Sequence, residues 1–301
     1  MPLIIKKYHI DILHSPVNVL PILSKKTNVI TIHDISFVTL AKGHKTKDMY
    51  QILGTSWSVR KAEKIIATSN ETIKEIKEAY KIPDKKIIKI YDGVDKKYTI
   101  LKKSNIEELR KKYNLPEKYI LSISTLEPRK NYIRQIRAFK RAKEKNKLGR
   151  KWGYVIVGGK GWKYESIINE IITTSGVRYL GFVEDEECVE LYNYAKLFLY
   201  CSLKEGFGLP ILEAMACGCP VITSKKSSMT EIAGNAAIKV NPYKIKEIEK
   251  AISLLAKNEK KRRKCIEQGL TWAKKFSWEA TAKKTINAYK IAYAQKNEED
   301  L

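Results

Sequence analysis

The sequence lacks several features that would place the protein in a special class. Its 301 residues contain no apolar run that approaches the roughly 20 residues of a membrane-spanning helix. The first residues, Met1 to Lys7, have no charged segment followed by a long apolar stretch, so they do not predict a secretory signal. These absences favour an ordinary globular protein, and we expect it to be cytoplasmic.

Cysteine is scarce, and its pattern excludes two further classes. The chain has five cysteines, an odd number, and none of them forms a CxxC pair of the metal-binding type: Cys188, Cys201, Cys217, Cys219 and Cys265. Disulfides are rare in the reducing cytosol. We therefore interpret these residues as reduced thiols.

Acidic residues are few compared with basic ones. The chain has 33 Asp and Glu against 58 Lys and Arg, a net charge of +25. One interpretation is lysine spread along the chain for solubility or ion networks, as in thermophiles. A second is peripheral contact with an anionic membrane that presents a lipid-linked acceptor. Nucleic acid is the least favoured partner, because no recognisable nucleic-acid module accompanies the charge.

Apolar runs and helical stretches alternate along nearly the whole chain, which is typical of parallel sheets with crossover helices. In the first part, this alternation predicts strands and helices at 11–14, 28–33, 47–61, 64–69, 70–80 and 87–90, with Asn70 as a helix N-cap. In the second part, it predicts elements at 119–124, 131–143, 154–159, 164–174, 177–180, 185–195, 197–200, 221–223, 237–240 and 246–295. We therefore predict the α/β class.

The length suffices for two domains of ordinary size. We assign residues 1–100 to a first domain and residues 118–280 to a second. Residues 101–117 are charged and lack strand patterns, so we place an interdomain linker there. Residues 281–301 are predicted to form a helix that packs back on the first domain.

The most informative stretch runs from Lys204 to Ile222, KEGFGLPILEAMACGCPVI. Glu205 and Glu213 lie eight positions apart, with a glycine-rich turn and an apolar helix between them. A helix start with exposed amides suits a phosphate, while carboxylates accept hydrogen bonds from hydroxyl groups. The alternative is a buried helix with Glu213 at its surface, but an acidic residue in so apolar a run is costly to bury without a partner. The pattern favours a nucleotide sugar as ligand.

This stretch resembles the signature of the retaining glycosyltransferases of family four, E-G-F-G-L-P-x-L-E-A-M-A-x-G-x-P-V, nearly residue for residue. The resemblance covers residues 11 to about 280 and implies the GT-B architecture, with two Rossmann-like parallel-sheet domains facing a cleft. It implies that Glu205 holds the donor sugar and that Glu213 accepts hydrogen bonds from the ribose hydroxyls. It also implies that backbone amides contact sugar and phosphate at Phe207, Gly208 and Leu209.

Two further segments fit the same family. In Ser124 to Asn131, STLEPRKN, the cations Arg129 and Lys130 follow a predicted strand. By resemblance they hold the donor diphosphate and stabilise charge as the sugar bond breaks; alone, the segment could be a solvated basic turn. Thr31 to Phe37, TIHDISF, resembles the H-D-x-S-F segment of mannosyltransferase-like members, which implies that His33 faces the donor sugar.

Other short segments also resemble the family, and each implies a less specific role. Gly181 and Phe182 resemble a turn that contacts the nucleotide base. Asp92 replaces the usual Asn of an N-G-V-D turn, and we expect little functional change because both residues tolerate turn geometry. The acidic run Glu184 to Glu187 suggests a metal site at first sight. Because helix N-termini favour acids and the family is typically metal-independent, we predict no metal and no other cofactor.

The resemblance stops short at the start of the chain. Family members usually open with more of the first sheet, so we expect a truncated N-terminal domain, short by roughly 60 to 80 residues compared with usual domain lengths. Three explanations stay open. The C-terminal helix covers the exposed sheet edge, a second subunit completes the domain as a homo-oligomer, or the chain is a fragment or degenerate copy.

Taken together, the resemblance implies a retaining hexosyltransferase. The favoured donor is GDP-mannose, with a UDP-sugar as the other possibility, and the acceptor is an unidentified glycan, lipid or other molecule. One alternative is a catalytically impaired sugar-nucleotide-binding protein. Another is a GT-B-type sugar-nucleotide epimerase, against which the adjacent Arg129 and Lys130 argue.

Overall fold

The structure is a computed structural model that describes residues 7–21, 26–35, 46–102, 105–145 and 147–299. The chain divides into two compact units, and each is described here by itself. Unit 1 comprises Met1–Gly93 together with Ser277–Leu301, and unit 2 comprises Val94–Phe276. Among the described residues, no helix combines the length and the apolar character needed to cross a bilayer.

Unit 1 contains a parallel sheet with the strand order β1-β2-β3-β4. Its strands are β1 (Ile12–Ser15), β2 (Thr27–Ile32), β3 (Lys64–Ala67) and β4 (Ile87–Lys89). They are connected through α3 (Thr46–Lys61), α4 (Asn70–Tyr80) and the short 3-10 helix η1 (Asp84–Lys86). The central strands β2 and β3 are buried along their whole length, as expected for parallel strands covered on both faces.

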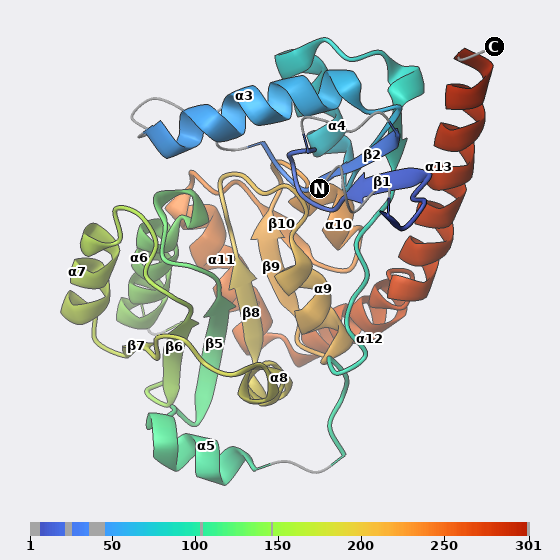
Figure 1. The fold of residues 1–301 in the computed structure, drawn as a ribbon. Coiled ribbons are helices and arrows are strands. Elements are labelled where there is room, and N and C mark those ends of the chain that lie inside the picture. Colours follow the sequence, from blue (N-terminus) through green and yellow to red (C-terminus); the bar gives the residue numbers. More distant parts are fainter. Residues whose placement is uncertain (1–6, 22–25, 36–45, 103–104, 146, 300–301) are drawn as a thin grey trace. The chain divides into compact units, whose positions relative to one another are not determined.

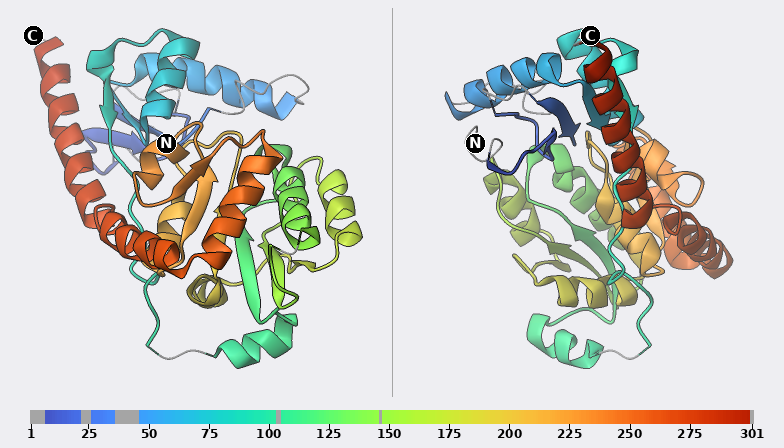
Figure 2. Two further views of the ribbon diagram at one scale, coloured as in Figure 1. Left: turned by 180° about the vertical axis from the view of Figure 1, so that it is seen from behind. Right: turned by 45° about the vertical axis from the view of Figure 1, so that its right-hand side comes forward.

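Helix α13 (Trp278–Glu299) covers one face of this sheet, and α3 and α4 cover the other (Figures 1 and 2). Val29 and Ile66 pack in one cluster with Ala288 of α13. Their neighbours Ile30 and Ile65 pack in a second cluster, with residues of α3 and α4. Successive residues of a strand point to opposite faces, so the last helix of the chain completes the core of the unit in which the chain begins.

Unit 2 contains a parallel sheet with the order β10-β9-β8-β5-β6-β7 (Figure 1). Its strands are β5 (Lys118–Ile123), β6 (Trp152–Val157), β7 (Val177–Tyr179), β8 (Leu197–Tyr200), β9 (Val221–Ser224) and β10 (Ile238–Val240). The chain builds outward from β5 to β7, returns to β8 beside β5, and builds outward again to β10. This is the doubly wound order of nucleotide-binding folds. The α/β prediction is confirmed.

Helices lie on both faces of this second sheet. They are α5 (Ile106–Tyr113), η2 (Pro128–Lys130), α6 (Tyr132–Glu144), α7 (Glu165–Thr173), α8 (Asp185–Tyr194), α9 (Leu209–Ala216), α10 (Met229–Ala233), α11 (Ile245–Lys257) and α12 (Glu259–Ala273). Ile120, Tyr154 and Leu197 pack from the sheet against α6 and α11. On the opposite face, Tyr192 of α8 packs edge-on against Phe198.

The structure differs from the sequence prediction at two places. Ser69, not Asn70, caps α4, because the extended Ser69 backbone lets its hydroxyl accept a hydrogen bond from the Thr72 amide. Residues 101–117, predicted as a linker, contain helix α5, which belongs to unit 2 and contacts α8. The chain instead changes units between Gly93 and Val94 and again between Phe276 and Ser277.

Candidate active site

The predicted diphosphate-binding cations and the first signature carboxylate follow neighbouring strands. Arg129 and Lys130 lie in η2, after β5, and Glu205 lies in the loop after β8. β5 and β8 pair directly, and the winding of the sheet reverses between them. In open α/β sheets, ligands bind outside the carboxyl ends of the strands at this reversal. The topology of unit 2 therefore brings these three residues to its expected ligand-binding edge.

The three side chains form one ion-pair cluster. Glu205 Oε1 lies 2.7 Å from Lys130 Nζ, and Glu205 Oε2 lies 2.7 Å from Arg129 Nη1. Tyr200, the last residue of β8, donates its hydroxyl to Glu205 Oε1 at 2.9 Å. On its other side, Arg129 Nε donates to Glu127 Oε2 at 2.8 Å. A single carboxylate thus fixes both cations relative to each other.

The cluster is almost closed to solvent, with 7% of Glu205 and 8% of Lys130 exposed. Burial on its own would raise the pKa of Glu205, but the adjacent Lys130 and Arg129 outweigh burial and lower it. Burial likewise works against the charge of Arg129, and the carboxylates of Glu205 and Glu127 overcome it, so the pKa of Arg129 is raised. Burial lowers the pKa of Lys130, and the carboxylate of Glu205 opposes this shift. The shifts of Glu205 and Arg129 favour their charged forms at neutral pH.

Backbone and amide contacts lock the loop after β5 to the loop after β8. The Leu203 amide donates to the Arg129 carbonyl at 2.8 Å. Asn131 Nδ2 donates to the Cys201 carbonyl at 2.9 Å. Gln135 of α6 donates to the Lys130 carbonyl at 2.7 Å, and its own oxygen accepts from the Cys201 amide. These bonds hold the cations in place before any ligand arrives.

Two serines that follow β9 also hold the Glu205 loop through hydrogen bonds. Ser227 and Ser228 both donate their hydroxyls to the Glu205 carbonyl, at 2.7 and 2.9 Å. Ser228 also donates to the Phe207 carbonyl at 2.8 Å. Gly208 then starts α9 with φ +110°, a conformation that favours glycine. The first N–H groups of a helix have no partner within it, so the start of α9 is suited to an anion.

Glu213, the second signature carboxylate, lies one turn into α9 in different surroundings. Tyr192 of α8 donates its hydroxyl to Glu213 Oε2 at 3.0 Å. Burial raises the pKa of Glu213 to about 7, with Asp185 adding to the rise, while the hydrogen bonds from Tyr192 and Tyr98 oppose it. Glu213 therefore changes charge near neutral pH.

The predicted base-contacting turn lies after β7. Gly181 has φ +74°, and its carbonyl accepts a hydrogen bond from the Gly158 amide at 2.7 Å. The side chain of Phe182 is exposed, with 73% of its surface open to solvent. An exposed aromatic ring at the carboxyl edge of the sheet is available for stacking on a planar ligand.

His33 belongs to unit 1 and follows β2. Its Nδ1 lies 3.4 Å from Oδ2 of the buried Asp92. A cavity of about 390 Å³ is lined by His33 together with Val17, Asn18, Val19, Asp34 and Gln51. Ser36 and Phe37 of the matching segment lie outside the described residues.

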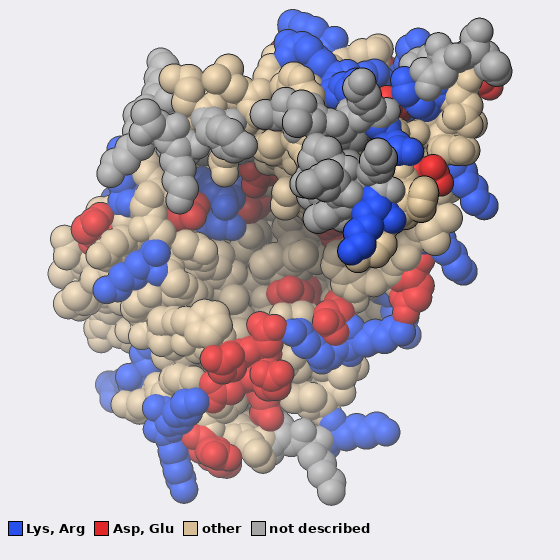
Figure 3. Space-filling model, viewed as in Figure 1, with Lys and Arg blue, Asp and Glu red and all other residues tan. Residues whose placement is uncertain are grey.

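The acidic side chains of α8 gather on one face of unit 2, where lysines neutralise several of them (Figure 3). Asp185 pairs with Lys97, and Glu187 lies 2.6 Å from Lys112. Within the described part of the chain, no group of three or more His, Cys, Asp or Glu residues is placed to hold a metal ion.

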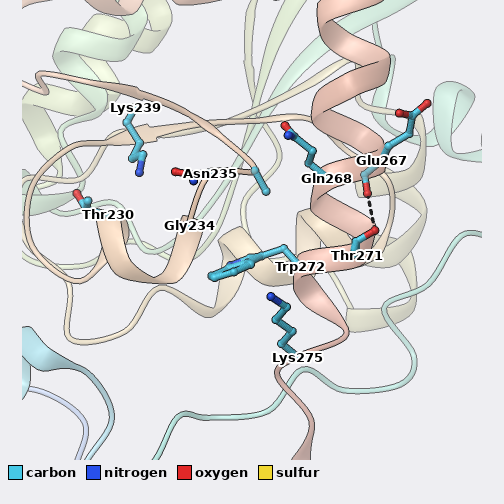
Figure 4. Close-up of a pocket in the computed structure, with 10 residues that line it drawn as sticks. Thr230, Gly234, Asn235, Lys239, Glu267, Gln268, Thr271, Trp272 and Lys275 are labelled. Carbon is cyan, nitrogen blue, oxygen red and sulfur yellow. Dashed lines mark hydrogen bonds between the residues drawn. The ribbon is translucent and has the colours of Figure 1, made fainter.

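A larger cavity of about 530 Å³ lies elsewhere in unit 2, around Trp272 (Figure 4). Lys275 Nζ lies 4.5 Å from the Trp272 ring, whose Nε1 donates to the Ile232 carbonyl. None of the predicted site residues lines this cavity, so it is separate from the cluster around Glu205.

Sequence reasoning missed several residues of the candidate site. Tyr200 could have been found, because it ends the predicted strand that leads to the Glu205 loop. Ser227 and Ser228 follow β9, and nothing in their spacing predicts bonds to the Glu205 loop. Tyr192 precedes Glu213 by 21 residues in another helix, and no sequence signal joins the two.

Two family models match the chain. The model described as glycosyl transferases group 1 matches residues 105–272, and the model described as glycosyltransferase family 4 matches residues 1–98. The first spans more than half of the chain and includes the ion-pair cluster, α9 and α10.

Several curated relatives are bacterial mannosyltransferases. The O-antigen chain mannosyltransferase B of Escherichia coli is 32% identical over 293 residues, which cover 95% of this chain and 76% of the relative. The serotype-specific mannosyltransferase WbdA of Escherichia coli is 30% identical over 236 residues, which cover 76% of this chain and 29% of that relative.

Solved structures share the fold at low sequence identity. HepE of Anabaena, in complex with UDP and glucose, aligns with a TM-score of 0.80 at 18% identity, over 96% of this chain and 80% of that chain. Sucrose-phosphate synthase from Thermosynechococcus elongatus aligns with a TM-score of 0.79 at 20% identity, over 98% of this chain and 76% of that chain. The chain matches the group 1 model over more than half of its length, is similar to the Escherichia coli relative, and shares the GT-B fold of these neighbours. The chain therefore belongs to the group 1 glycosyltransferases.

Proposed function

We propose that this glycosyltransferase moves a mannosyl group from GDP-mannose to a glycan acceptor and retains the anomeric configuration. The observation that carries the proposal is the Arg129–Lys130–Glu205 cluster at the strand-order reversal of unit 2. The choice of mannose rests on the two Escherichia coli relatives, both of which are named as mannosyltransferases. The same residues would serve a UDP-sugar, so the donor base is part of the test.

The two cations keep hydrogen-bonding capacity for a diphosphate. Arg129 uses Nε for Glu127 and Nη1 for Glu205, and its Nη2 makes no hydrogen bond with the described residues. Lys130 uses two of its three donors, on Tyr200 and Glu205. A planar guanidinium fork and a neighbouring ammonium can both bind phosphate oxygens.

The chemistry proposed for the cluster is electrostatic. As the bond between sugar and diphosphate breaks, negative charge grows on the leaving phosphate oxygens. Cations that are already fixed in a nearly dry site stabilise this charge without reorganisation. Arg129 and Lys130 meet that requirement, because Glu205 and the bonds between the two loops hold them in advance.

The remaining roles follow the family signature. The start of α9, at Gly208 and Leu209, would offer backbone amides to the donor. The ionised form of Glu213 would accept hydrogen bonds from the ribose hydroxyls. His33 in unit 1 would contact the transferred sugar. We propose that the reaction needs no metal ion, since Arg129 and Lys130 would supply positive charge to the diphosphate.

The test is a transfer assay with GDP-mannose and, in parallel, UDP-glucose, using mannose-terminated oligosaccharides as acceptors. We expect transfer from GDP-mannose, an α-linked product by NMR of the anomeric proton, and unchanged rates after addition of EDTA. A β-linked product would contradict retention. Binding of GDP-mannose without transfer or hydrolysis would favour a catalytically impaired sugar-nucleotide-binding protein.

A further inference from the structure

The ring of His33 lies beside the carboxylate of Asp92. Asp92 is buried, with 6% of its surface exposed, whereas about half of the His33 side chain is open. Asp92 Oδ2 and His33 Nδ1 lie 3.4 Å apart. The exposed part of the ring helps to line the cavity of about 390 Å³ in unit 1. His33 therefore lies beside the buried carboxylate of Asp92 and also lines the cavity.

The backbone of His33 is fixed as well. The hydroxyls of Thr68 and Thr72 both donate to the His33 carbonyl, each at 3.2 Å. Thr68 follows β3 and Thr72 lies in α4, so two elements of unit 1 hold the same carbonyl. Neighbours within unit 1 therefore hold the His33 carbonyl, and Asp92 lies beside one of its ring nitrogens.

The C-terminal segment fixes the turn that carries Asp92. Gly93 packs so closely on the start of α13 that an added Cβ would clash with the Trp278 amide nitrogen. Thr281 of α13 donates its hydroxyl to the Tyr91 carbonyl at 2.7 Å. Because both neighbours of Asp92 are tied to residues 277–281, the carboxylate is presented to His33 by a rigid turn.

The charges around His33 favour its protonated form. The hydrogen bond to Asp92 is the largest influence and raises the pKa of His33, and burial opposes it. The carbonyl of Pro16 and the carboxylate of Asp34 also raise it. His14 is a further titratable group that interacts with His33; its two ring nitrogens bond to Thr31 and Tyr289, and burial and the charge of His33 lower its pKa. The neutral form of His14 is therefore favoured beside a protonated His33.

We propose that Asp92 is a positioning residue for His33. Its carboxylate orients the imidazole and keeps it protonated, so that the ring presents a fixed positive charge to the cavity of unit 1. This inference rests on the proposed function, in which His33 contacts the transferred sugar. It also revises our expectation that Asp92 in place of Asn matters little, because that expectation considered turn geometry alone.

The decisive variant is Asp92→Asn, which keeps the size of the side chain and the turn but removes the charge. The chain has only four histidines, so NMR titration of their ring signals can follow His33 directly, with His33→Gln to assign it. We expect the midpoint of His33 to fall in Asp92→Asn. Asp34→Asn is the matched control, since Asp34 influences His33 only through space, and its effect should be smaller.

The second readout is the pH profile of transfer, expressed as the ratio of variant to wild-type kcat/KM at each pH. We expect Asp92→Asn to lose about tenfold at pH 8, the effect of turning a charge-assisted hydrogen bond into a neutral one. The loss should shrink toward pH ~5.5, where even an unassisted histidine is protonated. Rescue at low pH separates a charge effect from a merely structural one.

An unchanged His33 midpoint in Asp92→Asn would overturn the proposal, as would a loss of activity that is the same at every pH. If the midpoint falls but the ratio stays at one throughout, Asp92 is not a positioning residue for this reaction. Failure of the proposed function gives a different result, because a wild-type enzyme that does not use GDP-mannose leaves the NMR titration intact.

Discussion

The two signature carboxylates of unit 2 belong to one continuous motif, yet their surroundings differ sharply. Glu205 lies between Lys130 and Arg129, which lower its pKa in spite of burial. Glu213 accepts a hydrogen bond from the Tyr192 hydroxyl, and burial raises its pKa to about 7. One motif therefore holds two carboxyl groups whose pKa values are shifted in opposite directions, Glu205 by adjacent cations and Glu213 by burial.

The largest effect should come from Glu205→Gln. This change leaves two buried cations without their shared counter-ion, and breaking a buried pair in this way costs about 3–5 kcal/mol of unfolding free energy. Denaturant unfolding at pH 7 measures the loss, and we also expect transfer activity to fall by roughly two to three orders of magnitude. Glu127→Gln, which removes only the outer partner of Arg129, should cost much less. Equal stability of Glu205→Gln and wild type would contradict the assigned role.

Glu213→Gln should act in the opposite direction on stability. The folded-state pKa of Glu213 lies above its ordinary value, so the ionised carboxyl disfavours the folded state as pH rises from about 4.5 to 7. Removing it should stabilise the protein by about 1–3 kcal/mol at pH 8 and hardly at all at pH ~4.5. Unfolding curves at the two pH values provide the measurement. A loss of stability at pH 8 would show that Glu213 is paired more strongly than the structure indicates.

The same variant should change donor binding. Only the ionised carboxyl accepts two ribose hydrogen bonds, so the wild-type KM for GDP-mannose should rise as pH falls below about 7. In Glu213→Gln we expect the KM to be several-fold higher at pH 8 and nearly independent of pH, as for loss of one charged hydrogen bond. Initial rates from pH 6 to 8.5 give both curves. A variant KM that still rises below pH 7 would assign the titration to another group.

The smallest effect should come from Asp185→Asn. Asp185 is one of the groups that raise the pKa of Glu213, and its exposed pair with Lys97 contributes little to stability. We expect the pH midpoint of the donor KM to move slightly lower while the melting temperature hardly changes. Lys97→Ala should move the midpoint the other way, because Lys97 lowers the pKa of Glu213. Midpoints that move together in the two variants would exclude this electrostatic coupling.

Much of the candidate site could be predicted from the sequence. Apolar runs predicted strands at 119–124 and 197–200, and the structure has them at Lys118–Ile123 and Leu197–Tyr200. Because the carboxyl ends of parallel strands meet at one edge of a sheet, Arg129 and Lys130 could be expected near Glu205. The strand order that puts β5 beside β8 follows from the doubly wound fold.

Side-chain contacts between separate elements could not be predicted. The sequence analysis assigned the cations to the diphosphate and Glu205 to the sugar, but it did not foresee that Glu205 pairs with both cations. The partners of Glu213 and of His33 come from distant positions, Tyr192 and Asp92. Such contacts depend on loop conformations, and no periodicity or spacing rule encodes them.

The measurement that tests the central claim most directly is a calorimetric titration of GDP-mannose into wild type, Arg129→Ala and Arg134→Ala. Arg134 is a matched control, since it lies in α6 and bonds to Asn131 rather than to Glu205. We predict saturable one-to-one binding to wild type, at least tenfold weaker binding to Arg129→Ala, and near-normal binding to Arg134→Ala. Equal affinity of wild type and Arg129→Ala would contradict the claim that this cluster holds the donor diphosphate.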